Sequence, residues 1–425
     1  MPNSANVDRI SLEELCDEEE YLVETQDHWT LVITRYKPKK VAFEQPLAGV
    51  PFLLVHGFSQ NRHAWTSGEF VKNMAFFGAD IHILELRGHG KSSTALQYRR
   101  HRRDGRPLPG DIQWAWDVDS YFMFDLPAAI REVKRKTGRR KMVYVGHSMG
   151  GMLGYGLASW QQEDFLGLVT IGAPSDIGRG FPLIQMLALV DLLGVPAVDA
   201  LLWELNTARK VSHATRKRLA DFVEALPIVP ETVVDKLTPN EEPAELKFQV
   251  VPVDLLLRTV QKFFNRPGTL LGGIPKYIPL MWNPERANPE RIKSLLNIGG
   301  GPEPRAVVRQ FARWIRKDEL KCYKLNYDFK KNFDKIEIPV AIVFGDQDRI
   351  ADLKSTSSIY KNARSNYLLW RPVKGNSHID LTMGHDIRQI CYDIKNLADY
   401  ALKHQHKEPS LPRVEEPPTP AQAAG

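Results

Sequence analysis

Short runs of apolar residues recur through the N-terminal half of the chain and return near its C-terminal end. Each run is too short for an ordinary helix and ends at glycine or a turn residue, as buried strands of a parallel sheet do. The first two runs flank a polar Gln-Asp-His and predict a hairpin. The predicted strands are 21–25 and 30–34 for the hairpin, followed by 51–57, 80–86, 142–146, 165–171 and 339–345.

The segments between these strands carry a helical period, most clearly over 65–77, 116–136 and 150–161. Strands that alternate with helices predict an α/β fold, a mostly parallel, doubly wound sheet with helices on both faces. The length of 425 residues exceeds that of one average domain. It suits either two or three domains or one large α/β unit that carries an insertion.

The alternation stops after residue 173. From there to residue 334 the chain predicts successive helices that prolines punctuate, without a convincing strand, and we interpret this stretch as an inserted helical cap. The last residues are rich in proline and poor in bulky apolar groups, which predicts disorder. The predicted organisation is an acidic N-terminal segment (1–20), a core in two parts (21–173 and 335–403), the helical cap (174–334) and a disordered tail (404–425).

Apolar residues make up 43% of the chain and charged residues 25%, which excludes collagen-like, fully disordered and disulfide-scaffold proteins. The three cysteines are scattered, match no zinc spacing and favour a reducing compartment. The N-terminus is acidic and has neither a basic leader nor an apolar core of a signal peptide. The longest stretch free of Asp, Glu, Lys and Arg, residues 142–162, is rich in glycine. We therefore expect a cytoplasmic protein without a transmembrane segment.

The net charge is +6, and much of the excess lies in two basic segments, 99–106 and 131–141. A solvated basic face is the simpler interpretation. Peripheral contact with an anionic membrane or lipid surface is the alternative. Neither segment has the aromatic interleaving of a nucleic-acid binder, so we expect no nucleic-acid partner.

The most specific motif is Gly146-His147-Ser148-Met149-Gly150, a match to G-x-S-x-G at the point where a strand meets a helix. A serine on such a sharp turn projects its hydroxyl above the sheet. The glycines on either side are required because a Cβ there would collide with the strand or the helix. Ser148 is therefore the candidate nucleophile.

A serine hydroxyl needs a base to remove its proton and a carboxylate to orient that base. The carboxylate is sought in Gly345-Asp346-Gln347-Asp348, directly after the strand 339–345. Asp346 leaves the strand at once and can brace the turn, whereas Asp348 lies far enough along the loop to reach a histidine. We favour Asp348 and retain Asp346 as the alternative.

The candidate base is His378, about 30 residues beyond the acid, in the loop before the last predicted helix. The resulting order of Ser, Asp and His along the chain is the one expected of a G-x-S-x-G hydrolase. His385 is the alternative base, about 10 Å further along a helix, so at most one of the two reaches Ser148. His147 is adjacent to the serine and is expected to be a packed neighbour.

Acyl transfer also needs donors for the oxyanion of the tetrahedral intermediate. The sequence His56-Gly57-Phe58 ends the third predicted strand, so we assign the donors to the backbone N–H groups of Phe58 and Met149. The segment 87–93 contains glycine, lysine and serine but lacks the P-loop spacing, so it predicts a structural turn. No metal-ligand cluster or dinucleotide motif is found, and the chemistry needs no cofactor.

With these motifs the chain is identified as a member of the α/β-hydrolases, and it resembles the acid lipases, which are the gastric and lysosomal lipases and their bacterial relatives. The resemblance covers about 21–401. It implies the α/β-hydrolase fold and makes Ser148 the nucleophile, Asp348 the acid and His378 the base, with oxyanion donors on Phe58 and Met149. The segments that carry it are 56–58, 125–130, 146–150, 307–314, 327–329, 345–348 and 378–381.

Two positions depart from the family, which usually has His-Gly-Leu where this chain has Phe58, and often glutamine where it has Met149. Only a backbone N–H is used at either position, so the departures change the pocket wall. The chain is expected to be a serine ester hydrolase that cleaves lipophilic acyl esters through an acyl-enzyme. An acyltransferase or polyester depolymerase with the same triad is the alternative, followed by a non-catalytic binding module. The oligomeric state and the ester are not predicted.

Overall fold

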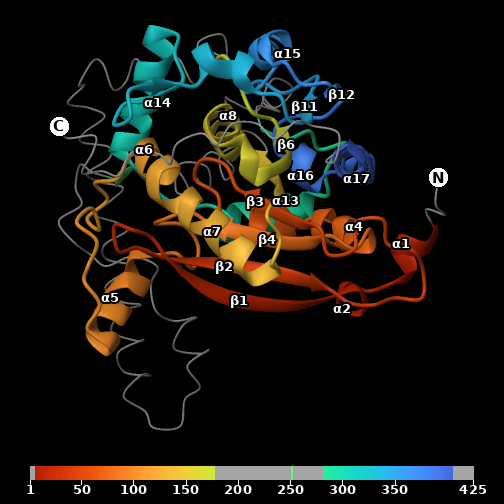
Figure 1. The fold of residues 1–425 in the computed structure, drawn as a ribbon, viewed down its shortest axis with the longest axis horizontal. Helices are drawn as coiled ribbons and strands as arrows, with labels where there is room; N and C mark the ends of the chain where they lie inside the picture. The colour runs from red at the N-terminus through yellow and green to blue at the C-terminus, as the bar shows by residue number, and fades with distance from the viewer. Residues whose placement is uncertain (1–4, 178–249, 252–280, 405–425) are drawn as a thin grey trace, which may run out of the picture.

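The computed structural model describes residues 5–177, 250–251 and 281–404. Eight strands form one sheet in the order β1-β2-β4-β3-β5-β6-β11-β12 (Figure 1). The strands are β1 (Cys16–Glu24), β2 (Thr30–Pro38), β3 (Pro51–Val55), β4 (Asp80–Glu85), β5 (Met142–His147), β6 (Phe165–Ile171), β11 (Val340–Gly345) and β12 (Leu368–Val373).

The sheet is antiparallel from β1 through β2 to β4 and parallel from β4 to β12. This confirms the predicted mostly parallel sheet. The hairpin differs in extent, because β1 begins at Cys16 rather than at residue 21 and pairs with β2 along its whole length. The sequence did not predict β12, whose side chains are mostly half-buried at the edge of the sheet.

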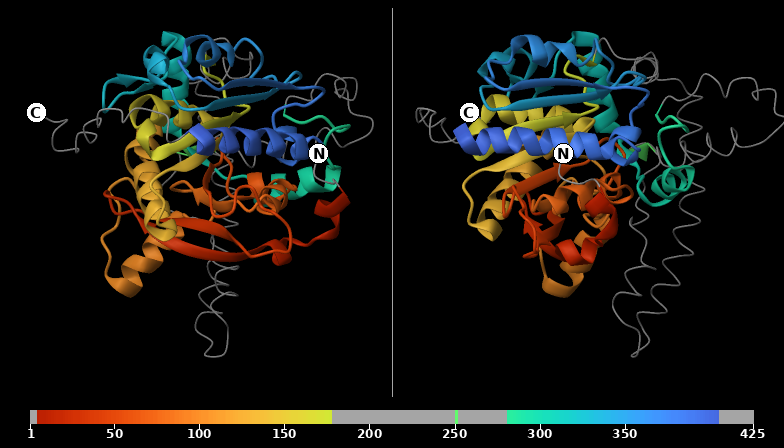
Figure 2. Two further views of the ribbon diagram at one scale, coloured as in Figure 1. Left: turned by 45° about the vertical axis from the view of Figure 1, so that its right-hand side comes forward. Right: turned by 90° about the vertical axis from the view of Figure 1, so that its right-hand side faces the viewer.

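Alternate side chains of the central strands enter two separate apolar cores, as the period of two of a β-strand requires. Phe52 and Leu54 of β3 belong to one core, and Leu53 and Val55 belong to the other. The first core packs under α4 and α17, and the second under α7 and α8 (Figure 2). The sheet is therefore buried on both faces, which explains why its parallel strands are apolar throughout.

The larger helices follow the predicted alternation with the strands, with added pieces such as α5 and α15. A π-helical turn, η1 (Tyr121–Asp125), interrupts the predicted helix 116–136. The helices are α1 (Ala5–Arg9), α2 (Leu12–Leu15), α3 (His63–Thr66), α4 (Phe70–Phe76), α5 (Thr94–Asp104), α6 (Val118–Ser120), α7 (Leu126–Thr137), α8 (Met149–Trp160), α13 (Pro289–Ile298), α14 (Arg305–Lys317), α15 (Ser357–Asn362), α16 (Asp380–Met383) and α17 (Ile387–His404), with 3-10 turns η2 (Gln162–Asp164) and η5 (Lys330–Lys335).

The long insertion lies between β6 and β11, where the sequence predicts the cap. Its described part contains helices, as expected. It also contains two small antiparallel pairs, which corrects the expectation of no strand. The pairs are β7 (Val250–Val251) with β8 (Glu303–Pro304), and β9 (Lys321–Cys322) with β10 (Tyr327–Asp328). Much of the predicted cap and residues 405–425 of the predicted tail lie outside the described residues.

Among the described residues, no helix combines the length and the apolar character needed to cross a bilayer. Cys16, Cys322 and Cys391 are buried and free. The cytoplasmic location stays a prediction. The segment 87–93 forms a turn after β4, as predicted, and its first residue, Arg87, is a buried structural cation paired with Asp125.

Candidate active site

Ser148 stands on the sharp turn between β5 and α8, with backbone angles φ 52° and ψ −119°. A residue other than glycine is strained at such angles, and the surrounding contacts maintain the turn. Its N–H donates to the carbonyl of Ile171 at 2.9 Å. A Cβ on Gly146 would lie 2.4 Å from the backbone of Gly150, and one on Gly150 would lie 2.4 Å from the carbonyl oxygen of Val55. Only glycine fits at either position.

His378 and Asp348 form a buried hydrogen-bonded pair. Asp348 lies in the loop after β11, His378 lies before α16, and Nδ1 of the histidine is 2.8 Å from Oδ2 of the carboxylate. The other carboxylate oxygen, Oδ1, accepts from the N–H groups of Ile350 and Ala351 at 2.7 and 2.9 Å. Burial alone would raise the pKa of Asp348, but His378 and these N–H groups together hold it below its usual value. The carboxylate is therefore ionised and fixed in orientation.

Contacts around the end of β6 bring Ser148 and His378 to the same place. A Cβ on Gly172, directly after β6, would lie 3.1 Å from Nδ1 of His378. The ring of His147, the neighbour of Ser148 in the chain, is 4.8 Å from the ring of His378 between centroids. A Cβ on Gly57 would lie 2.8 Å from the Cβ of Ser148. The loops after β3, β5 and β6 and the histidine loop thus converge at the carboxyl edge of the sheet.

The second carboxylate of the acid loop has a different environment. Asp346 is exposed, and its Oδ1 accepts the N–H of Gly375 at 2.6 Å. It therefore braces the turn after β12, which is the role that the sequence offered as its alternative. The structure pairs His378 with Asp348 and not with Asp346.

The two other candidate histidines are not arranged as bases for Ser148. His385 is exposed, and its backbone N–H donates to the carbonyl of Arg286. His147 is buried, and its Nδ1 is 2.8 Å from Oε1 of Gln60. Burial, with the nearby His378, lowers the pKa of His147 to about 3. His147 is therefore a neutral packed neighbour.

The backbone N–H groups predicted as oxyanion donors flank the serine turn. Met149 is the first residue of α8. The N–H of a first helical residue has no acceptor within its own helix. Phe58 follows β3 in the loop whose Gly57 approaches Ser148, and its half-buried ring packs on Phe311 of α14 at 5.5 Å. In the part of the chain that the structure describes, neither N–H has a hydrogen-bond acceptor.

Several residues that support the site were not predicted from the sequence. Gln60 accepts the N–H of Gly57 at 2.9 Å and so fixes the start of the loop that carries Phe58. Asp380 accepts the N–H groups of Ser377 and Asn283, each at 2.8 Å, and so ties the histidine loop to the insertion. Burial raises the pKa of Asp380 to about 6. The acidic residue two positions after His378 was the available signal.

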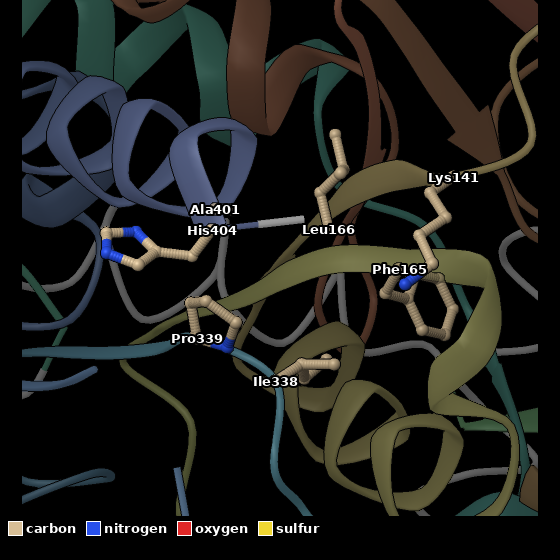
Figure 3. A pocket seen from close by; sticks show the side chains of 7 residues that line it. All are labelled: Lys141, Phe165, Leu166, Ile338, Pro339, Ala401 and His404. Atoms are coloured by element: carbon tan, nitrogen blue, oxygen red, sulfur yellow. The ribbon is translucent and has the colours of Figure 1, made fainter. Parts of the chain in front are cut away.

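Figure 3 shows a small hollow between the end of α17 and the starts of β6 and β11. It is found at the amino ends of the strands, whereas Ser148 is at the carboxyl end of β5, so it takes no part in the site. Within the described residues, no group of three or more His, Cys, Asp or Glu side chains is arranged to hold a metal ion. The residues that line the hollow are Lys141, Phe165, Leu166, Ile338, Pro339, Ala401 and His404.

Comparison with known proteins agrees with the fold. Residues 50–199 match the family described as "alpha/beta hydrolase fold". A tear acid lipase-like protein of Mesocricetus auratus is 23% identical over 90% of this chain and 87% of its own. The lysosomal acid lipase/cholesteryl ester hydrolase of Homo sapiens is 29% identical over 32% of this chain and 33% of its own. The solved α/β-hydrolase GrgF from Penicillium has a TM-score of 0.49 at 13% identity and covers 91% of this chain and 99% of its own.

The chain has the α/β-hydrolase fold, and its residues 50–199 match the family of that name. It is similar to the acid lipases, and it is an ester hydrolase of the lipase and esterase type.

Proposed function

We propose that the chain hydrolyses lipophilic acyl esters with Ser148 as nucleophile, His378 as base and Asp348 as orienting acid. The observation that carries the proposal is the 2.8 Å hydrogen bond between Nδ1 of His378 and Oδ2 of Asp348. An ionised carboxylate only accepts, so Nδ1 carries the proton, and Nε2 of the neutral imidazole is the free base. That tautomer is the one a serine nucleophile requires.

The steps follow from these positions. His378 removes the proton of the Ser148 hydroxyl as the oxygen attacks the ester carbonyl, and the N–H groups of Phe58 and Met149 stabilise the oxyanion. The histidine then protonates the departing alcohol and leaves an acyl group on the serine. Water, activated by the same histidine, resolves this acyl-enzyme. An alcohol in place of water would give acyl transfer.

The proposal of a lipophilic substrate depends on the insertion, which we propose to act as a cap that lines the acyl site. Met281 and Trp282 of the insertion are half-buried and pack on an apolar cluster that contains Ile379 and Met383. Since Ile379 follows His378, apolar side chains of the insertion lie beside the catalytic loop. Longer apolar runs in the sequence of the insertion also favour an acyl site there. Apart from Met281 and Trp282 they lie outside the described residues. The runs are 181–190, 200–203, 253–264 and 277–282.

The first test is dependence on acyl-chain length. Because an apolar acyl site gains binding free energy with each buried methylene, turnover of p-nitrophenyl octanoate should exceed turnover of the acetate. Initial rates across a series from acetate to palmitate measure this, and Ser148→Ala gives the background. Product analysis with an added alcohol separates hydrolysis from acyl transfer. An enzyme that prefers acetate and ignores octanoate would instead be a small-ester esterase.

Peripheral contact with an anionic lipid surface also stays a proposal. The residues 101–106 at the end of α5 and beyond it are exposed. Arg100 and Arg106, however, both pair with Glu24, at 2.5 and 2.6 Å, so part of the local positive charge is already neutralised.

A further inference from the structure

Glu303 of β8 is a fully buried carboxylate in the insertion that contacts the loop after β3. Its Oε1 accepts the N–H of Ser59, the residue after Phe58, and lies 3.0 Å from Nε2 of His89. Its Oε2 is 3.4 Å from the hydroxyl of Tyr121. Burying a carboxylate is costly unless it is paired and hydrogen-bonded. The proposed mechanism gives this group no chemical task.

His89 is the charged partner of this carboxylate. Its Nδ1 is 2.9 Å from the carbonyl oxygen of Arg87, and its Nε2 faces Glu303. Both of these oxygens only accept, so both ring nitrogens carry protons. Burial by itself would lower the pKa of His89, but Glu303 raises it above its usual value. The neighbouring His56 differs, because its Nε2 accepts the N–H of Leu86 and burial holds its pKa well below the usual value.

Residues 298–301 of the insertion, just before Glu303, form further hydrogen bonds to the loop after β3. The N–H of Gly301 donates to the carbonyl of Ser59 at 2.9 Å, and Asn61 donates from Nδ2 to the carbonyl of Ile298 at 2.8 Å. Ser59 has φ 59°, an unfavourable angle for a residue other than glycine. Such a conformation persists only when its surroundings maintain it.

These contacts bear on the direction of one N–H group. The N–H groups before and after Phe58 in the chain, those of Gly57 and Ser59, are fixed by Gln60 and Glu303. With both neighbouring peptide units held, the Phe58 N–H has little freedom to turn. An oxyanion donor is effective only when it is aimed before the charge develops.

We propose that the buried pair Glu303–His89 positions the Phe58 N–H as an oxyanion donor, so that the insertion supports catalysis through the loop after β3. The inference rests on the proposed function, since it concerns the same oxyanion. Glu303 does not touch the substrate, and it acts as a positioning residue.

The test is Glu303→Gln, which keeps the size of the side chain and removes its charge. The glutamine oxygen can still accept from both Ser59 and His89. It carries no charge, however, so both hydrogen bonds weaken and the loop loosens. The expected result is a fall in kcat of about 10-fold to 100-fold on p-nitrophenyl octanoate, below the loss from deleting a donor outright. KM should change by less than about threefold, because the effect concerns the transition state. Glu290→Gln, an exposed carboxylate on α13, is the matched control and should leave both constants unchanged.

Hydrogen–deuterium exchange of the full chain gives a second readout that does not depend on turnover. Exchange over 57–61 should be faster in Glu303→Gln than in the wild type and in Glu290→Gln. If the wild type hydrolyses no ester, the proposed function fails while the exchange result still tests the restraint on the loop. A folded Glu303→Gln protein with unchanged kcat, or with unchanged exchange over 57–61, would overturn the inference.

His89→Gln provides the same test if Glu303→Gln fails to fold. The new amide can still donate to Glu303 but carries no charge, so a smaller fall in kcat is expected, again with little change in KM. Where both single variants fold, the double variant should lose no more than the worse of the two, because the side chains act as one unit. Unchanged kcat in a folded His89→Gln protein, or additive losses in the double variant, would overturn the inference.

Discussion

Ser148→Ala should lower ester turnover by at least about 10⁴-fold, because the nucleophile and its base act as a unit. The melting temperature should stay close to that of the wild type. The Ser148 side chain makes no capping hydrogen bond to α8, so removing the hydroxyl breaks no such contact. Rates on p-nitrophenyl esters and thermal unfolding of the same preparations measure both effects.

The matched variant is His378→Ala, which should cost about as much turnover as Ser148→Ala. The double variant should lose little more than either single one. Residual turnover above a few per cent of wild type in the Ser148→Ala protein would exclude Ser148 as the nucleophile. Full activity in His385→Ala is expected from the exposed position of that side chain.

Asp348→Asn should lower kcat by about 10⁴-fold with little loss of stability. The asparagine oxygen can keep the hydrogen bonds from Ile350 and Ala351, which turns its NH₂ group toward His378. The histidine nitrogen on that side, Nδ1, must then accept, so the proton moves to Nε2 and the base is lost. Steady-state rates together with chemical denaturation separate this tautomer effect from unfolding.

The control for that variant is Asp346→Asn. Asp346 is exposed and accepts one N–H from Gly375, which an asparagine oxygen can also accept. Turnover should therefore change by less than about twofold, within the range of ordinary surface substitutions. If Asp346→Asn reduced turnover more than Asp348→Asn did, the acid would be Asp346.

The buried centre of the sheet was predictable because its strands are apolar on both faces and end in turn residues. The outer strands were not. Residues 16–20 of β1 are largely acidic and exposed, yet they pair with β2, because backbone pairing at an edge tolerates polar side chains. Strand β12 pairs with β11 in a regular parallel register. Its sequence was not recognised as a strand because Arg371 and Pro372 interrupt the apolar pattern.

The residues of the predicted triad could be located in the sequence because each follows a strand or precedes a helix at a recognisable turn. Their supports could not, since a buried hydrogen bond leaves no periodic signal. Glu303 and His89 are 214 positions apart, and only the fold brings them together. The segment 87–93 was noticed for its glycines, but the pairing of its histidine with a carboxylate from the insertion appears only in the fold.

The most direct measurement is mass spectrometry of the purified protein after reaction with a fluorophosphonate. One adduct per chain is expected, and peptide mapping should locate it on Ser148. The Ser148→Ala protein should acquire none, and Asp348→Asn should acquire it slowly. A folded wild-type protein that gains no adduct, or that carries the adduct on another residue, would contradict the assignment of Ser148 as the catalytic nucleophile.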